Sequence, residues 1–172
     1  KIYGDSTIGP HCKVGGEIGN SVFQGFSNKG HDGYLGNSVI GEWCNLGADT
    51  NGSNLKNNYS NVKLWDYVTQ SAIDTELIFC GLIMGDHSKT GINTMLNTGT
   101  LIGVGSNIFG ANFPPTFIPS FSWGSGTDFM EHDFDKFCNT AEKVMARRGL
   151  PLSKENKSAL QWVFQASSKF RS

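Results

Sequence analysis

Residues 84 to 113 read MGDHSKTGINTMLNTGTLIGVGSNIFGANF, and an apolar or threonine side chain returns at every sixth position. These guide positions are Met84, Thr90, Leu96, Ile102 and Ile108. Four positions after each guide residue comes a small or amide side chain, namely Ser88, Thr94, Thr100, Ser106 and Asn112. A period of six matches neither the alternation of an ordinary strand nor the 3.6-residue period of a helix.

The same six-residue spacing occurs elsewhere in the chain, at Ile2, Ile8 and Val14 and again at Ile40 and Leu46. Hexapeptide repeats of this kind form a parallel β-helix, in which three hexads make one triangular coil. A single coil cannot bury its own guide residues, so the coils must stack. We therefore predict an all-β fold, a left-handed parallel β-helix, over residues 1–112.

Two segments break this register, residues 18–35 and residues 51–80. We expect both to be loops extruded from the coil, and we expect the functional residues there, because a stacked coil has little freedom to supply them.

The pattern changes again after Asn112. Residues 113–127 are rich in proline and aromatic residues and predict an ordered exit from the coil. Residues 128–172 predict a helical appendage, with helical apolar spacing over 135–148, a stop at Gly149 and Pro151, and a second helix from Ser153 to about Phe170. The chain should end in an α-helical hairpin.

Composition narrows the classes of function. The 172 residues carry a net charge of -1 without a basic block, which argues against nucleic acid as the main partner. No apolar run is long enough to span a membrane and no signal peptide is visible. Four cysteines without a C-x-x-C pair predict neither zinc nor disulfides and favour a cytoplasmic location. The chain begins with Lys1, so we expect the natural protein to continue upstream.

Two motifs then give a resemblance to a known family. Gly30-His-Asp-Gly-Tyr-Leu-Gly36 and Ile40-Gly-Glu-Trp-Cys-Asn-Leu-Gly-Ala-Asp-Thr50 resemble the acetyltransferase domain of bifunctional N-acetylglucosamine-1-phosphate uridyltransferase/glucosamine-1-phosphate acetyltransferases. Gly85-Asp-His-Ser-Lys-Thr90, Asn107-Ile-Phe-Gly110 and the segment 113–124 are similar to a divergent Bacteroidetes-type branch described as sugar nucleotidyltransferases.

The resemblance implies an acetyl-CoA-dependent N-acetyltransferase that acts on an amino-sugar 1-phosphate, with glucosamine-1-phosphate as the expected acceptor, in UDP-N-acetylglucosamine synthesis. It also implies an upstream nucleotidyltransferase domain of the same protein, and a homotrimer whose subunits hold acetyl-CoA between adjacent coils. No metal is expected, because the histidines at 11, 31, 87 and 132 include no closely spaced pair. We expect His87 in an outward slot, with a capping role or a role at the edge of the cofactor.

Residue roles follow from the same resemblance. His31 matches the catalytic histidine, which as a neutral imidazole can take a proton from the attacking amine. Tyr34 and Asn45 match residues that contact the sugar phosphate, and Lys13 and Lys63 are the candidates for binding its phosphate. For each there is a simpler alternative: a loop histidine bonded to local backbone, a tyrosine covering the coil, an asparagine at a corner, or solvated lysines.

For the cofactor, Ala48 matches a position whose backbone touches acetyl-CoA. Gly91, Ile92 and Gly110 are assigned by register, and ordinary coil geometry explains them equally well. Asn58 and Tyr59 resemble an Asn-Tyr pair in the extruded loop of the family.

One position departs from the family pattern. Where the family has another phosphate-contacting lysine, this chain has Gly19, with Lys29 as a nearby substitute. This leaves open a second hypothesis, a non-catalytic β-helix that trimerises and regulates a sugar-1-phosphate nucleotidyltransferase.

Overall fold

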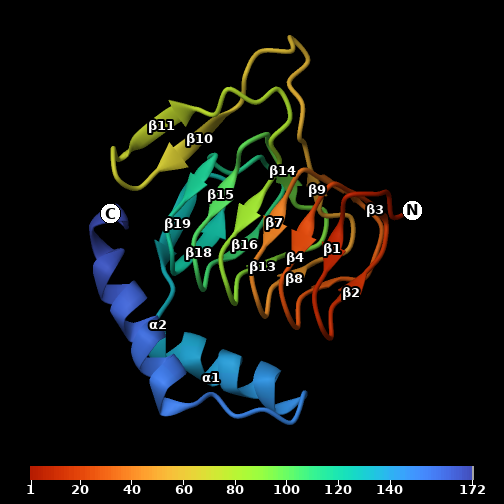
Figure 1. The fold of residues 1–172 in the computed structure, drawn as a ribbon. Coiled ribbons are helices and arrows are strands. Elements are labelled where there is room, and N and C mark those ends of the chain that lie inside the picture. Colours follow the sequence, from red (N-terminus) through yellow and green to blue (C-terminus); the bar gives the residue numbers. More distant parts are fainter. Residues whose placement is uncertain (172) are drawn as a thin grey trace.

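The computed structural model describes residues 1–171 and confirms a left-handed parallel β-helix followed by two helices (Figure 1). The coil has three faces, each a sheet of short parallel strands. The first face contains β1 Thr7–Ile8, β4 Val22–Phe23, β7 Val39–Ile40, β12 Ile83–Met84, β15 Leu101–Ile102 and β17 Phe117–Ile118. The second face contains β2 Lys13–Val14, β5 Asn28–Lys29, β8 Asn45–Leu46, β13 Lys89–Thr90, β16 Asn107–Phe109 and β18 Ser122–Ser125, with the antiparallel β19 Asp128–Glu131 at its end. The third face contains β3 Glu17–Gly19, β6 Tyr34–Gly36, β9 Asn51–Gly52 and β14 Met95–Leu96.

Guide residues form the core because they stack in register from coil to coil. On the first face Ile40 pairs with Met84 and Met84 with Ile102, and all three side chains are buried. Burial of such a side chain contributes roughly 1.5–3 kcal/mol each. The apolar cluster therefore runs along the axis of the coil instead of forming one compact centre.

The small side chains that come four positions after a guide residue join successive coils by buried hydrogen bonds. The Ser88 hydroxyl donates to the carbonyl of Gly103 at 2.6 Å and accepts from the amide of Ser106 at 3.0 Å. Ser27 does the same between Gly41 and Cys44, at 2.6 and 2.8 Å. A larger side chain would not fit, and an apolar one would leave the carbonyl without a donor.

Residues 18–35 do not form the expected extruded loop. They form β3, β4, β5 and β6 and continue all three faces. The period was hidden because Ile18 and Phe23 are only five residues apart and because the next guide slot holds Lys29. The chain does leave the coil after β9, and this excursion ends in the hairpin of β10 Lys63–Asp66 and β11 Ser71–Asp74 before β12.

Residues 113–127 also belong to the coil, contrary to the predicted exit at 112. Pro114 is buried six residues after Ile108, and Ile118 pairs with Ile102 on the first face. The step from Pro114 to Ile118 is only four residues, so the six-residue period is lost while the coil continues. Asp128–Glu131 then turns back as β19, where a helix start was expected.

The predicted helical hairpin is present as α1 Phe134–Ala146 and α2 Lys154–Ala166, followed by the 3-10 turn Ser168–Phe170. Asp133 and Ser153 cap the two helices by accepting from backbone amides three residues later. Figure 1 shows α1 running back along the stack toward the N-terminal coils. Neither described helix has the length and apolar character needed to cross a membrane.

The three faces of the coil meet at three edges, as in a triangular prism. A column of stacked aromatic side chains follows the edge between the first and second faces and fixes the position of α1. The column consists of His11, Phe26, Trp43, His87 and Phe121, all with φ between 58° and 62°. Between His87 and Phe121 the same corner is occupied by Gly105, whose added Cβ would lie 3.0 Å from the Phe137 ring. Phe137 of α1 thus fills the gap, with ring centroids 5.8 Å from His87 and 5.0 Å from Phe121.

Candidate functional site

A second prism edge, between the second and third faces, carries His31, and we call it the His31 edge. His31 and Asp32 lie in the turn from β5 to β6. The amide of Asp49 donates to the carbonyl of Asp32 at 3.0 Å, and the amide of Asn93 donates to the carbonyl of Ala48 at 2.8 Å. The turns that contain His31, Ala48 and Ile92 are therefore stacked on successive coils.

Lys29 supports the turn that carries His31. Its side chain is fully buried, and its ammonium donates to the carbonyls of His31 and Asp32, both at 3.1 Å. Burial lowers the pKa of Lys29, while Asp32 and Asp49 oppose that shift. The substitute role considered for Lys29 is therefore wrong, because its ammonium faces the protein interior and holds the backbone of the turn.

Tyr34 lies beside the His31 edge, on the third face. Its backbone amide donates to Asn51 Oδ1 at 2.8 Å. Its phenol and the amide of Asn54 both lie over Gly36, since a Cβ at Gly36 would come within 2.6 Å of Asn54 Nδ2. Tyr34, Asn51 and Asn54 line a cavity of about 470 Å³, together with Met95 and Phe113. A phenol and two side-chain amides thus line one cavity on the face that follows the turn of His31.

Lys13 and Asn45 lie on the other side of the His31 edge, on the second face. Both are exposed strand residues, and the register places Asn28 between them, Lys13 opposite Asn28 and Asn28 opposite Asn45. The guanidinium of Arg148, from the end of α1, reaches Asn28 Oδ1 at 3.5 Å. Sequence reasoning missed Asn28, Arg148 and Asn54, because only the three-dimensional coil brings them to this region.

The loop candidates Asn58, Tyr59 and Lys63 are not joined to His31 by any hydrogen bond within residues 1–171. Asn58 Oδ1 accepts from the amide and hydroxyl of Ser60, at 3.1 and 2.9 Å, so it closes its own turn. Tyr59 is 69% exposed, and Lys63 pairs with Asp74 in the hairpin. In this chain the amide beside Tyr34 comes from Asn54.

Four of the cofactor candidates, Ala48, Gly91, Ile92 and Gly110, lie on the His31 edge. A Cβ on Gly91 would approach Phe109 Cβ to 3.1 Å, and one on Gly110 would approach Ser125 Cβ to 2.5 Å. Coil stacking thus accounts for both glycines. Ile92 is 69% exposed, and no acceptor for the amides of Ala48 and Ile92 occurs in the described chain. An exposed apolar side chain beside free amides suits an extended ligand with carbonyl groups, such as the pantetheine arm of acetyl-CoA.

His87 lies on the aromatic column, away from the His31 edge. Its ring is stacked with Trp43 and buried, which corrects the expectation of an outward slot. Burial, with a smaller effect of Lys89, lowers the pKa of His87 to about 4. Its Nδ1 has no hydrogen-bond partner among the described residues.

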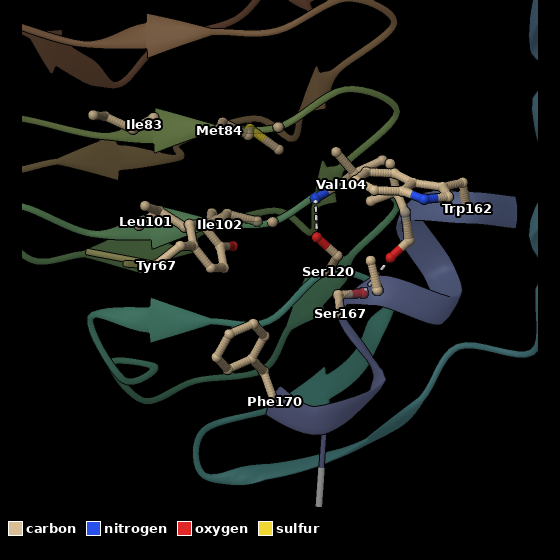
Figure 2. A pocket seen from close by; sticks show the side chains of 14 residues that line it. Tyr67, Ile83, Met84, Leu101, Ile102, Val104, Ser120, Trp162, Ser167 and Phe170 are labelled. Carbon is tan, nitrogen blue, oxygen red and sulfur yellow. Dashed lines mark hydrogen bonds between the residues drawn. The ribbon is translucent and has the colours of Figure 1, made fainter. Parts of the chain in front are cut away.

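A further cavity of about 450 Å³ lies between the first face, the hairpin and α2. Figure 2 shows Ile83 and Leu101 on the coil side, Tyr67 from the hairpin, and Trp162 and Phe170 from the C-terminal segment. The lining is apolar, and none of the candidate site residues reaches it.

The coil is a parallel β-helix of hexapeptide repeats, and together with the relatives given below it suggests a hexapeptide-acyltransferase-like transferase. No family model matches the chain. It is 33% identical over 104 residues to the bifunctional protein GlmU of Trichodesmium erythraeum, which covers 59% of this chain and 18% of that protein. It is 35% identical over 96 residues to the bifunctional protein GlmU of Methanococcus aeolicus, and the matched residues are 56% of this chain and 22% of that protein.

The bifunctional protein GlmU of Methanocaldococcus jannaschii is 34% identical over 87 residues, which are 51% of this chain and 21% of that protein. The chain thus spans about a fifth of the length of the curated relatives it matches. These relatives confirm the resemblance given by the two motifs and support the sugar acetyltransferase/nucleotidyltransferase family.

Proposed function

We infer that this chain is an N-acetyltransferase that moves the acetyl group of acetyl-CoA to the amine of an amino-sugar 1-phosphate. Glucosamine-1-phosphate is the best candidate acceptor, and the domain would act within a larger sugar nucleotidyltransferase of nucleotide-sugar synthesis. One observation carries this proposal. His31 shares a prism edge with the free amides of Ala48 and Ile92, and three residues after it Tyr34 lines a cavity on the third face.

His31 would act as the general base. Its imidazole would accept a proton from the amine while the nitrogen forms a bond to the acetyl carbon. The carbon–sulfur bond breaks, and coenzyme A leaves as a thiolate that the imidazolium then protonates. The Lys29 ammonium holds the carbonyl of His31 at 3.1 Å, so the position of the base is set by the coil. Tyr34 and Asn54 offer neutral, directional hydrogen bonds to sugar hydroxyls from the third face.

Acetyl-CoA supplies the acetyl group as an activated thioester. Ala48 and Ile92 would hold it, because their free amides can donate to its carbonyls and the exposed Ile92 side chain offers apolar contact. Both residues lie on the coils that follow the coil of His31, which suits a ligand that extends along the edge.

A homotrimer belongs to this proposal and is supported by the outer row of the first face. Val22 and Val39 are 39% and 40% exposed and continue a row that includes Ile83 and Leu101. An apolar row of this kind is typical of a protein–protein contact. In a trimer, Asn58, Tyr59 and Lys63 would contact the site of a neighbouring subunit instead of their own.

A non-catalytic assembly domain is the second candidate. It is favoured by Gly19 in place of the expected lysine and by the position of the loop candidates, which leave His31 without a phosphate-binding lysine from that loop. In that case the apolar first face would be the functional surface.

Release of the coenzyme A thiol separates the two candidates. With acetyl-CoA and glucosamine-1-phosphate we expect thiol release by the wild type and a loss of about a hundredfold or more in His31→Gln, as for removal of a general base. His11→Gln is the matched control, because His11 is an exposed histidine on a different edge. Thiol release at background level with every amino-sugar phosphate would leave only the assembly role.

A further inference from the structure

The C-terminal end of α1 lies over the second face and encloses a cavity of about 270 Å³. Three elements line this cavity. They are the end of α1 and the residues after it, with Val144, Arg147 and Arg148, the outer row of the second face, with Lys13 and Asn28, and the aromatic column, with Phe26 and Trp43.

Three of these side chains are cationic, and none is neutralised by an acidic partner. The only salt bridge within residues 1–171 joins Arg171 to Glu131, far along the chain from this cavity. Arg148 donates to the neutral Asn28 Oδ1, at a long 3.5 Å. Because the whole chain has a net charge of -1, a cavity with three uncompensated cations is a marked local excess of positive charge. An anion would relieve their mutual repulsion.

The aromatic floor restricts the shape of that anion. Phe26 and Trp43 are stacked with centroids 4.1 Å apart and an angle of 4°, and their outer faces are covered by His11 and His87. Both rings therefore present edges to the cavity, and ring edges carry the positive part of the quadrupole. Edges favour an anion but give a base or a sugar ring no face on which to stack.

We propose that this cavity binds the phosphate group of a phosphorylated metabolite. Arginine forms paired, charge-assisted hydrogen bonds with phosphate oxygens, and a third cation at Lys13 suits a dianion better than a carboxylate. The site adjoins the His31 edge, since Asn28 is three residues before His31 and Lys13 is a candidate for binding the acceptor. Phosphate binding does not depend on acetyl transfer. Only the source of the phosphate, an amino-sugar phosphate or coenzyme A, rests on the proposed function.

Calorimetric titration of the protein with inorganic phosphate at constant ionic strength tests the site directly. We expect saturable binding by the wild type and a loss of about tenfold to a hundredfold in affinity for the double variant Arg147→Gln/Arg148→Gln. Lys143→Gln is the matched control. This variant removes a cation from the last turn of α1, just before the two arginines, but Lys143 does not line the cavity, so the phosphate affinity should stay within about twofold of wild type.

Equal phosphate affinity in the wild type and the double variant would overturn the proposal, as would displacement of phosphate by chloride at equal ionic strength. Either result would mean that the two arginines only offset the partial negative charge at the C-terminal end of α1. Competition identifies the source of the phosphate. Displacement by glucosamine-1-phosphate but not by coenzyme A assigns the site to the acceptor, and the reverse assigns it to the donor. Because neither assay needs turnover, an inactive protein with an intact phosphate site is distinguishable from a failed site.

Discussion

His87 carries its imidazole inside the aromatic column, where protonation would bury a charge. Its Nδ1 has no partner in the described chain, and Trp43 and Phe137 cover the ring. The pKa is lowered to about 4, mainly by burial. In the unfolded chain the ring regains its ordinary pKa near 6.5. The unfolded state therefore binds a proton first as the pH falls.

This difference predicts an acid-sensitive stability. The contribution of neutral His87 is fully present above pH 6.5 and is lost as the pH falls through about 4. Between pH 7.5 and 4.5 we expect the wild type to lose about 2–3 kcal/mol more unfolding free energy than His87→Phe, which keeps the stacked ring but cannot be protonated. Guanidinium unfolding at both pH values measures the two losses. Carboxylates titrate in both proteins, so an equal loss would show that His87 contributes nothing.

At the scale of elements, the main aromatic contact between α1 and the coil is Phe137, which lies in the gap at Gly105. Phe137 touches His87, Phe121 and His132, with centroids 5.8, 5.0 and 5.8 Å away. Phe134 adds a second aromatic contact to Phe121, with ring centroids 5.9 Å apart.

Phe137→Ala should therefore destabilise the protein by about 3–5 kcal/mol, because it removes a buried ring that packs on His87, Phe121 and His132. Thermal unfolding followed by circular dichroism measures the effect. Trp162→Ala in α2 is the control, because Trp162 is 68% exposed and its loss should cost under about 1 kcal/mol. A similar loss in both variants would mean that the column does not anchor α1.

Most elements were predictable where the six-residue period is unbroken, as from Met84 to Ile108. The prediction failed where the coil takes a shorter step, from Ile18 to Phe23 and from Pro114 to Ile118. A corner can lose a residue and still bring the next guide side chain into the core, so strict spacing underestimates the length of the coil.

The candidate site was predictable only in part, for a related reason. Motifs place His31, Tyr34 and Ala48 within a short segment, and the coil brings their turns together. No local pattern could place Arg148 near Asn28, because 120 residues and the whole coil separate them. The prediction for Lys29 was wrong because the sequence alone does not show that this lysine occupies a guide position and points into the coil.

At the scale of the whole molecule, the three faces differ in what they offer to a partner. The second face is polar along its outer row, with Lys13, Asn28 and Asn45, whereas the first face presents valines and isoleucine. The first face is partly covered by the hairpin and α2, and its exposed part lies at the N-terminal coils.

Assembly should therefore depend on the exposed part of the first face. We expect the wild type to sediment as a trimer and Val22→Lys/Val39→Lys as a monomer, because each lysine would place a charge in an apolar contact. Sedimentation velocity measures the change. The control is Asn45→Lys on the second face, which should remain trimeric. A trimer that survives both lysines would exclude the first face as the interface.

The filled gap at Gly105 also sets a limit on how this coil can vary. A solenoid can in principle gain or lose one turn by duplication or deletion, because every turn makes the same contacts with its neighbours. Here one turn lacks its corner side chain and receives a side chain from α1 instead. An added or deleted turn between His87 and Phe121 would move that vacancy by one coil spacing, about 4.8 Å, away from Phe137. The contact between Phe137 and the gap at Gly105 therefore restricts the number of turns between His87 and Phe121.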